Sequence, residues 1–210
     1  MSLLSQISEQ LQLGLEEEVA ALTREAIQQN MTPKDILDNG LIAGMNIVGE
    51  KFRSHEFFLP DVLLAAKAMY AGMNEIKPLL IKDKVPSMGK VVIGTVRGDL
   101  HDIGKNLVGV MLRGAGFDVI DLGNDVPPAK FIETARNAGA KVIGMSALLT
   151  TTMPAMKEVV ALLKSEGLTD QIHTIVGGAP VSQEYAREIG ASAYSYDASN
   201  AVDRIRALMN

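Results

Sequence analysis

Apolar residues recur at helical spacing through the first eighty residues of the chain. Near the N-terminus the apolar positions lie three or four residues apart, as in an amphipathic helix: Leu11, Leu15, Val19 and Leu22. Thr32 before Pro33 is typical of a helix start, because a threonine hydroxyl caps free backbone N–H groups and proline suits the first turn. A later helix is expected to begin at Pro60. These patterns predict about four helices that pack as a small bundle.

The pattern changes after Lys90, where short β-branched runs alternate with helical repeats. Strands are expected at 91–93, 119–120, 142–143 and 175–176, with a weaker one at 191–196. Helices are expected near 104–115, 128–138, 153–166 and 182–189, and a last one from about Asn200. Such alternation predicts a parallel sheet with helices on both faces. The expected fold class is α/β, with an N-terminal four-helix bundle followed by a flavodoxin-like (Rossmann-type) five-stranded parallel sheet.

The segment between the two patterns is typical of a linker. Residues 77–90 hold two prolines, one glycine and several lysines. The sequence therefore predicts a helical domain at residues 1–84 and an α/β domain at residues 90–210. In a doubly wound sheet, ligands bind beyond the carboxyl ends of the strands, where the strand order reverses.

Composition and charge narrow the possible functions. The chain has no cysteine, which excludes disulfides, thiolate metal sites and cysteine nucleophiles. Its net charge of -5 gives no general basic surface for nucleic acid. No run approaches the roughly 18 apolar residues of a membrane span, and the N-terminus lacks the pattern of a signal peptide. We expect a cytoplasmic protein that has neither nucleic acid nor membrane as a partner.

The most informative segment is the polar loop after the first expected strand, residues 95–106. It holds two glycines and His101, one of only three histidines. Phosphate-binding and dinucleotide-binding loops need glycines at spacings that this loop lacks. A zinc site needs three or four ligands. A hydrolase built on Asp99, His101 and Thr152 would lack the turn pattern expected around its nucleophile.

A metal held by one imidazole fits this loop better. An imidazole that ligates a metal usually donates its other ring N–H to a carboxylate, and Asp99 lies two residues before His101. Gly98 and Gly104 allow a tight turn and the close approach of a bulky ligand. On the residues alone, a capped loop whose histidine makes only local hydrogen bonds is an equal alternative.

The loop also reads D-x-H-x-x-G from Asp99 to Gly104, which resembles the pattern of cobalamin-binding domains. Two later elements of that pattern follow in order, each at the end of an expected strand. They are the S-x-L of Ser146 and Leu148, and the pair Gly177-Gly178. Three elements at strand ends, spread over about eighty residues, make this resemblance specific.

The helical half carries a second resemblance. Residues 49–52, G-E-K-F, and residues 58–60, F-L-P, resemble the cap module that precedes the cobalamin domain in methionine synthase. Nearly the whole chain is similar to the corrinoid proteins of methanol, methylamine and methoxyaromatic methyltransferase systems. By position, this implies that Phe52 and Leu59 cover the upper face of a corrin, although the pattern alone would make them core residues of the bundle.

The resemblance also assigns the residues of the second half. It implies that His101 is the lower cobalt ligand, that Asp99 hydrogen-bonds His101 and that Thr152 holds Asp99. Other residues implied to bind the cofactor are Asp102, Ile103, Gly104, Ser146, Leu148, Thr150, Gly177 and Gly178. Within that set, the serine, leucine and threonine would line the slot for the displaced nucleotide tail, and the paired glycines would leave room for it.

The implied function is methyl carriage. The chain would bind cobalamin base-off and His-on, and shuttle a methyl group on cobalt between a donor methyltransferase and an acceptor methyltransferase. A reductive activase would be a further partner, and the chain would not be catalytic on its own. Two alternatives share the motif. An adenosylcobalamin-binding mutase subunit would need a substrate barrel, and a cobalamin-dependent regulator would usually need a DNA-binding or signalling domain.

Overall fold

The computed structural model describes residues 2–83 and 86–209. The chain divides into two compact units, a helical unit made mainly of the residues up to Ser87 and an α/β unit made of most residues from Met88 onward. The predicted end of the first domain, residue 84, lies outside the described residues. Within these ranges no helix is long and apolar enough to cross a membrane.

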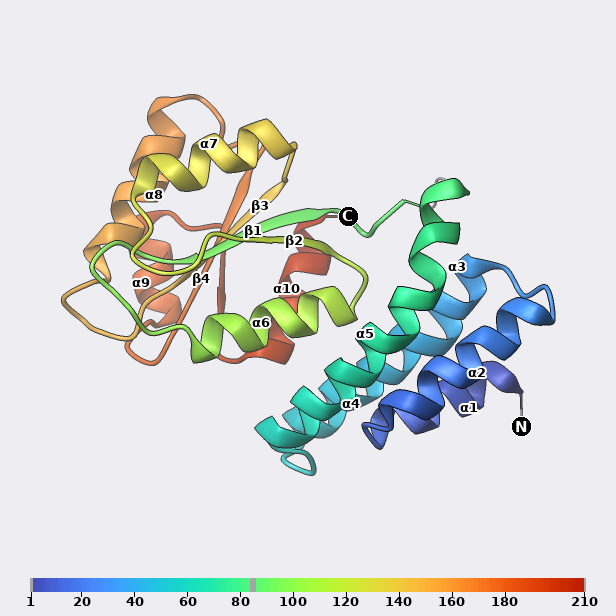
Figure 1. Ribbon diagram of the computed structural model, residues 1–210. Coiled ribbons are helices and arrows are strands. Elements are labelled where there is room, and N and C mark those ends of the chain that lie inside the picture. Colours follow the sequence, from blue (N-terminus) through green and yellow to red (C-terminus); the bar gives the residue numbers. More distant parts are fainter. Residues whose placement is uncertain (1, 84–85, 210) are drawn as a thin grey trace. The chain divides into compact units, whose positions relative to one another are not determined.

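Helices make up the first unit, coloured blue to green in Figure 1. Their bounds are α1 Leu3–Gln12, α2 Glu16–Gln28, α3 Pro33–Asp35, the π-helix η1 Ile36–Ile42, α4 Ala43–Arg53 and α5 Leu59–Lys82. Thr32 caps α3 as predicted, because its hydroxyl accepts the N–H of Asp35 at 3.1 Å. Since α3, η1 and α4 follow one another without a break, the unit has the four helical segments that the apolar repeat predicts.

Gly14 separates α1 from α2, although Leu11 and Leu15 suggest one continuous repeat. Its φ of 71° lies in the left-handed region that favours glycine. The N–H groups of Gly14 and Leu15 donate to the carbonyls of Leu11 and Gln10, at 2.9 and 3.1 Å. This pair of bonds is the usual way in which a left-handed glycine ends a helix. The apolar repeat at the N-terminus therefore belongs to two helices, and Leu15 lies exposed between them.

The prediction of a linker at residues 77–90 is wrong for its first part, because α5 continues to Lys82. Pro78 lies inside this helix, where it removes one backbone N–H close to the helix end. Ile76 is buried, and Leu79 and Leu80 are partly buried. The apolar repeat thus extends beyond the proline, and burial of these side chains outweighs one lost hydrogen bond.

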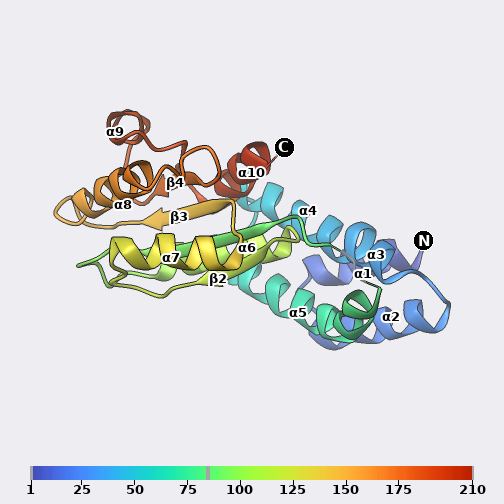
Figure 2. The same cartoon turned by 90° about the horizontal axis from the view of Figure 1, so that it is seen from above.

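Five parallel strands form the sheet of the second unit. They are β1 Lys90–Thr95, β2 Asp118–Asp121, β3 Val142–Ser146, β4 His173–Gly177 and β5 Ala193–Ser195. Their order is β2-β1-β3-β4-β5, so the order reverses between β1 and β3, which lie side by side in Figure 2. This is the flavodoxin-like order, and the predicted fold class is confirmed.

Helices cover both faces of this sheet. Their bounds are α6 Ile103–Gly114, α7 Pro128–Ala138, α8 Pro154–Ser165, α9 Gln183–Ile189 and α10 Ala198–Met209. Figure 1 shows α6 and α7 on opposite faces, as right-handed crossovers on either side of the reversal require. Residues from α7, α8 and α9 share one core with the strands, including Phe131, Met156 and Ile189. Because both faces are covered, β1 is a continuous apolar run in which Val91 and Val92 are fully buried.

The carboxyl ends of four strands align in one row. The register pairs Thr95 with Ser146, Ser146 with Gly177, and Gly177 with Ser195. The loops that leave β1 and β3 therefore start beside each other, at the reversal of strand order. The motif residues at the ends of β1, β3 and β4 share this edge of the sheet.

Candidate functional site

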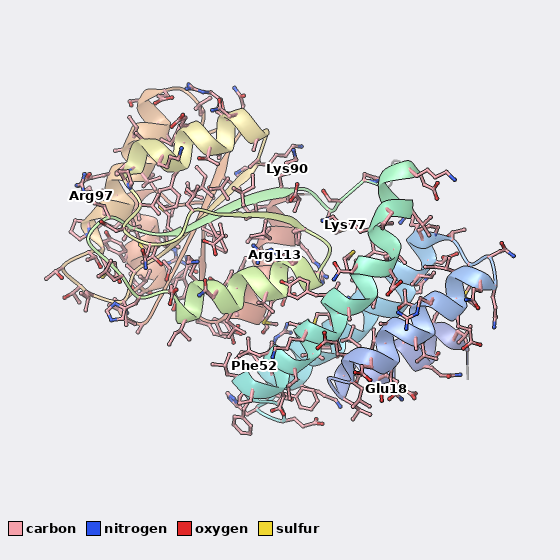
Figure 3. All side chains as sticks on the ribbon, in the orientation of Figure 1. Glu18, Phe52, Lys77, Lys90, Arg97 and Arg113 are labelled. Atoms are coloured by element: carbon pink, nitrogen blue, oxygen red, sulfur yellow. The ribbon has the colours of Figure 1, made fainter. Side chains whose placement is uncertain are left out.

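The loop between β1 and α6 carries His101 and the buried carboxylate of Asp99. Lys90 and Arg97, labelled in Figure 3, mark the start of β1 and the beginning of this loop. Asp99 is completely buried. Its Oδ1 accepts the backbone N–H of His101 at 3.0 Å and lies 2.8 Å from Nδ1 of the same residue. One oxygen therefore holds both the backbone and the ring of His101.

The second oxygen of Asp99 reaches the loop after β3. Oδ2 accepts the backbone N–H of Leu148 and the hydroxyl of Thr152, each at 2.7 Å. The N–H of Leu149 lies farther away, at 3.4 Å. Asp99 thus joins the two loops that meet at the reversal of strand order. The structure contains both the Asp99–His101 and the Thr152–Asp99 contacts that the resemblance implies.

These contacts keep Asp99 ionised at neutral pH. Burial opposes the charge and raises the pKa of a carboxyl group. In Asp99 this is outweighed by hydrogen bonds from the N–H groups of Leu148 and His101, from the Thr152 hydroxyl and from the imidazole, which hold its pKa well below the ordinary value. An ionised carboxylate can only accept hydrogen bonds. Nδ1 of His101 must therefore carry a proton, and in the neutral imidazole the free lone pair is then on Nε2.

The surroundings of His101 suit a flat, largely apolar metal complex. The imidazole side chain is 53% exposed. Four apolar side chains of the same two loops and of the first residue of α6 expose between 42% and 72% of their surface: Leu100, Leu148, Leu149 and Ile103. Because both oxygens of Asp99 already accept hydrogen bonds, this residue pair offers a metal one nitrogen and no oxygen. A metal held here has to bring most of its ligands, as the cobalt of a corrinoid does, so the residues fit that cofactor.

The other predicted residues of these two loops lie along the same edge. Ser146 ends β3, and Thr150 is exposed in the loop that follows. Asp102 directly precedes α6, and its carbonyl accepts the N–H of Asn106 at 2.7 Å. A Cβ atom added to Gly104 would meet nothing within 4 Å, so the start of α6 is open on that side. Contacts of these residues with a cofactor stay predictions.

The paired glycines have a local structural role of their own. Gly178 has a φ of 125°, and a Cβ atom there would overlap the backbone carbonyl of Ala147. A Cβ atom on Gly177 would lie 2.9 Å from the carbonyl oxygen of Ser195. Neighbouring backbone approaches both positions closely enough to require glycine. The space for a nucleotide tail, which the resemblance assigns to them, stays a prediction.

Phe52 and Leu59 lie in the helical unit, on either side of the short loop 54–58. Phe52 is near the end of α4, labelled in Figure 3, and Leu59 is the first residue of α5. Both are partly buried, whereas Phe58 between them is 64% exposed. Their role in covering a corrin stays a prediction.

The segment that runs from the end of β2 towards α7 lies outside the residues predicted from the sequence. Asp121 holds the almost fully buried ammonium group of Lys105, with Nζ–O distances of 2.7 and 2.5 Å. Asn124 and Asp125 contact the backbone just before His101. The turn signal G-N-D before a proline pair was present in the sequence, but nothing in its spacing indicates what the turn contacts.

Comparison with known proteins identifies the family. A family model described as a B12 binding domain matches residues 89–205, and a second model of the same description matches residues 3–77. Dimethylamine corrinoid protein 1 of Methanosarcina acetivorans is 46% identical over 186 residues, which is 88% of this chain and 87% of that protein. The chain belongs to the corrinoid proteins. Trimethylamine corrinoid protein 1 of the same organism is 45% identical over 196 residues, with 92% and 91% covered.

Solved structures agree with the assignment of this chain to the corrinoid proteins. A cobalamin-binding protein from Desulfitobacterium hafniense is 31% identical and superposes with a TM-score of 0.81, covering 98% of each chain. The methanol:cobalamin methyltransferase complex of Methanosarcina barkeri contains a chain that is 31% identical. It superposes with a TM-score of 0.88 and covers 99% of this chain and 79% of that chain. The predicted family and the predicted cobalamin-type cofactor are confirmed, and the mutase and regulator alternatives are not favoured.

Proposed function

We propose that this corrinoid protein carries a methyl group between a donor methyltransferase and an acceptor methyltransferase, with His101 as the lower cobalt ligand. The observation that carries the proposal is the 2.8 Å contact between Nδ1 of His101 and the buried carboxylate of Asp99. Relatives named after dimethylamine and trimethylamine, and a structural relative within a methanol:cobalamin methyltransferase complex, support the methyl-transfer role.

The residues of this chain would act by presenting one nitrogen in a fixed direction. Asp99 holds the proton on Nδ1, which leaves Nε2 of this half-exposed ring available to a metal. A carboxylate partner of this kind orients an imidazole and strengthens it as a metal ligand. The Thr152 hydroxyl and the N–H of Leu148 keep Asp99 in place. When bound, the corrinoid supplies a cobalt centre that accepts and releases the methyl group.

The two units would divide the remaining work. We assign cofactor binding to residues 90–210 and a capping role to residues 1–84, with Phe52 and Leu59 shielding the upper face of the corrin from water. The match of separate family models to the two halves supports a division into two domains. The proposed partners are the donor methyltransferase, the acceptor methyltransferase and a reductive activase. The activase rests on the resemblance alone.

Electron paramagnetic resonance of the cobalt(II) form tests the proposed ligand directly. Apoprotein would be produced with 15N only in histidine and reconstituted with unlabelled cobalamin. An axial 14N splits each cobalt line into three and an axial 15N splits it into two. We expect the doublet pattern, because His101 replaces the nucleotide base of the cofactor. A triplet in the labelled protein would show that the nitrogen belongs to the cofactor, and the proposed ligation would be wrong.

Two variants locate the nitrogen. His101→Ala should lose the doublet, and its affinity for cobalamin should fall. His173→Ala is the matched control, because His173 begins β4, at the opposite end of the strands from the candidate site. It should keep both the doublet and the affinity. If His101→Ala binds cobalamin with an unchanged spectrum, the assignment of His101 fails.

A further inference from the structure

We propose that Asp125 is a positioning residue for His101, because the loop between β2 and α7 clamps the backbone that leads to the imidazole. This inference rests on the proposed ligation by His101. Asp125 lies outside the motifs that suggested the cofactor, and its position in space is known only from the fold.

Two neighbouring residues hold three consecutive residues of the other loop. Oδ1 of Asp125 accepts the N–H of Gly98 at 2.7 Å, and the backbone N–H of Asp125 donates to the carbonyl of Asp99 at 3.0 Å. The side-chain amide of Asn124 donates to the carbonyl of Leu100 at 3.2 Å. These bonds therefore hold the backbone that leads into His101, while the carboxylate of Asp99 holds its ring.

The backbone conformation of Asp125 indicates that its carboxylate has a role. Its φ of 52° is left-handed, and only three residues other than glycine have positive φ in the described part of the chain. Glycine would adopt this conformation with the least strain. Strained backbone in non-glycine residues tends to occur where a side chain is needed for function. At this position the needed group is the acceptor for Gly98.

The helix that follows the His101 loop is held by the same segment. Lys105, in the first turn of α6, binds Asp121 at the end of β2 and also Asn106, at 2.6 Å. Oδ1 of Asp121 in turn accepts the N–H of Gly123 at 2.9 Å. The segment from β2 towards α7 therefore contacts the chain both before His101, in the loop, and after it, in α6. Asp125 is the contact that can be changed without leaving a buried charge unpaired.

A pair of substitutions separates positioning from general stability. Asp125→Gly removes the acceptor while relieving the left-handed backbone, so the unfolding midpoint of the apoprotein should stay the same or rise. Asp125→Asn keeps an oxygen acceptor and tolerates the same φ. Direct partners of metal-ligating histidines contribute about 10- to 100-fold. For Asp125, one contact farther away, we expect a smaller loss, about 3- to 10-fold in cobalamin affinity. The doublet fraction of the 15N-histidine spectrum should fall in Asp125→Gly, and Asp125→Asn should restore both readouts.

The outcomes are distinguishable from failure of the proposed function. If the unmutated protein shows no 15N doublet, the ligand assignment fails, and this inference fails with it. A doublet in the unmutated protein together with unchanged affinity and doublet fraction in Asp125→Gly would overturn the positioning role alone. Equal losses in both variants would also overturn it, since asparagine keeps the acceptor. So would a loss of affinity that is matched by a lower unfolding midpoint.

Discussion

Asp99→Asn is the sharpest perturbation of the site, because the amide cannot replace the carboxylate in either orientation. Oδ1 of Asp99 accepts the backbone N–H of His101, and Oδ2 accepts that of Leu148 on the other side. An amide has one oxygen and one NH2 group. If its oxygen faces His101, the NH2 group opposes the N–H of Leu148. If its oxygen faces Leu148, the NH2 group opposes the N–H of His101 and favours the imidazole tautomer with a proton on Nε2, which cannot bind a metal.

The expected cost follows from counting these bonds. One buried N–H loses its acceptor, at roughly 1–3 kcal/mol, and the remaining bonds lose the reinforcement of a charged acceptor, roughly 1 kcal/mol each. Relief of the buried charge offsets part of this loss. We therefore expect the free energy of unfolding of the apoprotein to fall by about 2–4 kcal/mol. The affinity for cobalamin should fall about 10- to 100-fold, as for other partners of ligating histidines.

Urea denaturation of the apoproteins measures the free energy of unfolding, and 15N NMR of the His101 ring measures its tautomer. Asp118→Asn is the matched control. It makes the same change of charge at the start of β2, at the opposite end of the strands, where Asp118 is exposed. The control should leave stability, tautomer and affinity unchanged. If Asp99→Asn keeps the stability and the Nδ1–H tautomer of the unmutated protein, the carboxylate does not orient the ring.

Three further predictions test the surrounding structure. Thr152→Val, which removes the buried hydroxyl, should destabilise the apoprotein by about 1–2 kcal/mol and weaken cobalamin binding, whereas Thr152→Ser should retain binding; equal binding by both would contradict the role of the hydroxyl. Gly178→Ala should cost more stability than Gly167→Ala, because both have positive φ but only the first would meet backbone; denaturant midpoints test this. Burial and a nearby acidic side chain raise the pKa of Tyr185, whose hydroxyl donates to the Met153 carbonyl at 2.7 Å. A raised pKa stabilises the fold below the unfolded value near pH 10, and this contribution is lost as pH rises through the folded pKa. Thermal unfolding of Tyr185→Phe should therefore show lower stability at neutral pH and a shallower loss above pH 10, and a parallel pH curve would contradict this.

The sequence predicted the strand ends and the central pair of the site because both have local signals. A β-branched run ends at a polar or glycine-rich turn, so the loop that carries Asp99 and His101 could be located without the fold. The alternation of strands and helices then implied that Ser146 and Gly177 lie on the same edge. The register, in which Ser146 pairs with both Thr95 and Gly177, agrees with that inference.

What the sequence did not reveal depends on contacts between distant segments. Asp125 is 27 residues from Gly98, and its role comes from the return of the chain through α6 and β2. The donors from Leu148 and Leu149 are backbone groups, which carry no sequence signal. The error at the end of α5 has a different cause. Pro78 and the neighbouring lysines were weighted above the apolar repeat, although a proline near a helix end removes only one hydrogen bond.

The strand order explains why a single carboxylate can organise the site. At the reversal between β1 and β3, one loop turns to a helix on one face of the sheet and the other loop turns to the opposite face. A group placed between them can contact both, and Asp99 occupies that place with one oxygen for each loop. The groups that donate hydrogen bonds to Asp99 all belong to this chain. The imidazole of His101 is therefore oriented before a cofactor arrives, and binding need not include the cost of ordering it.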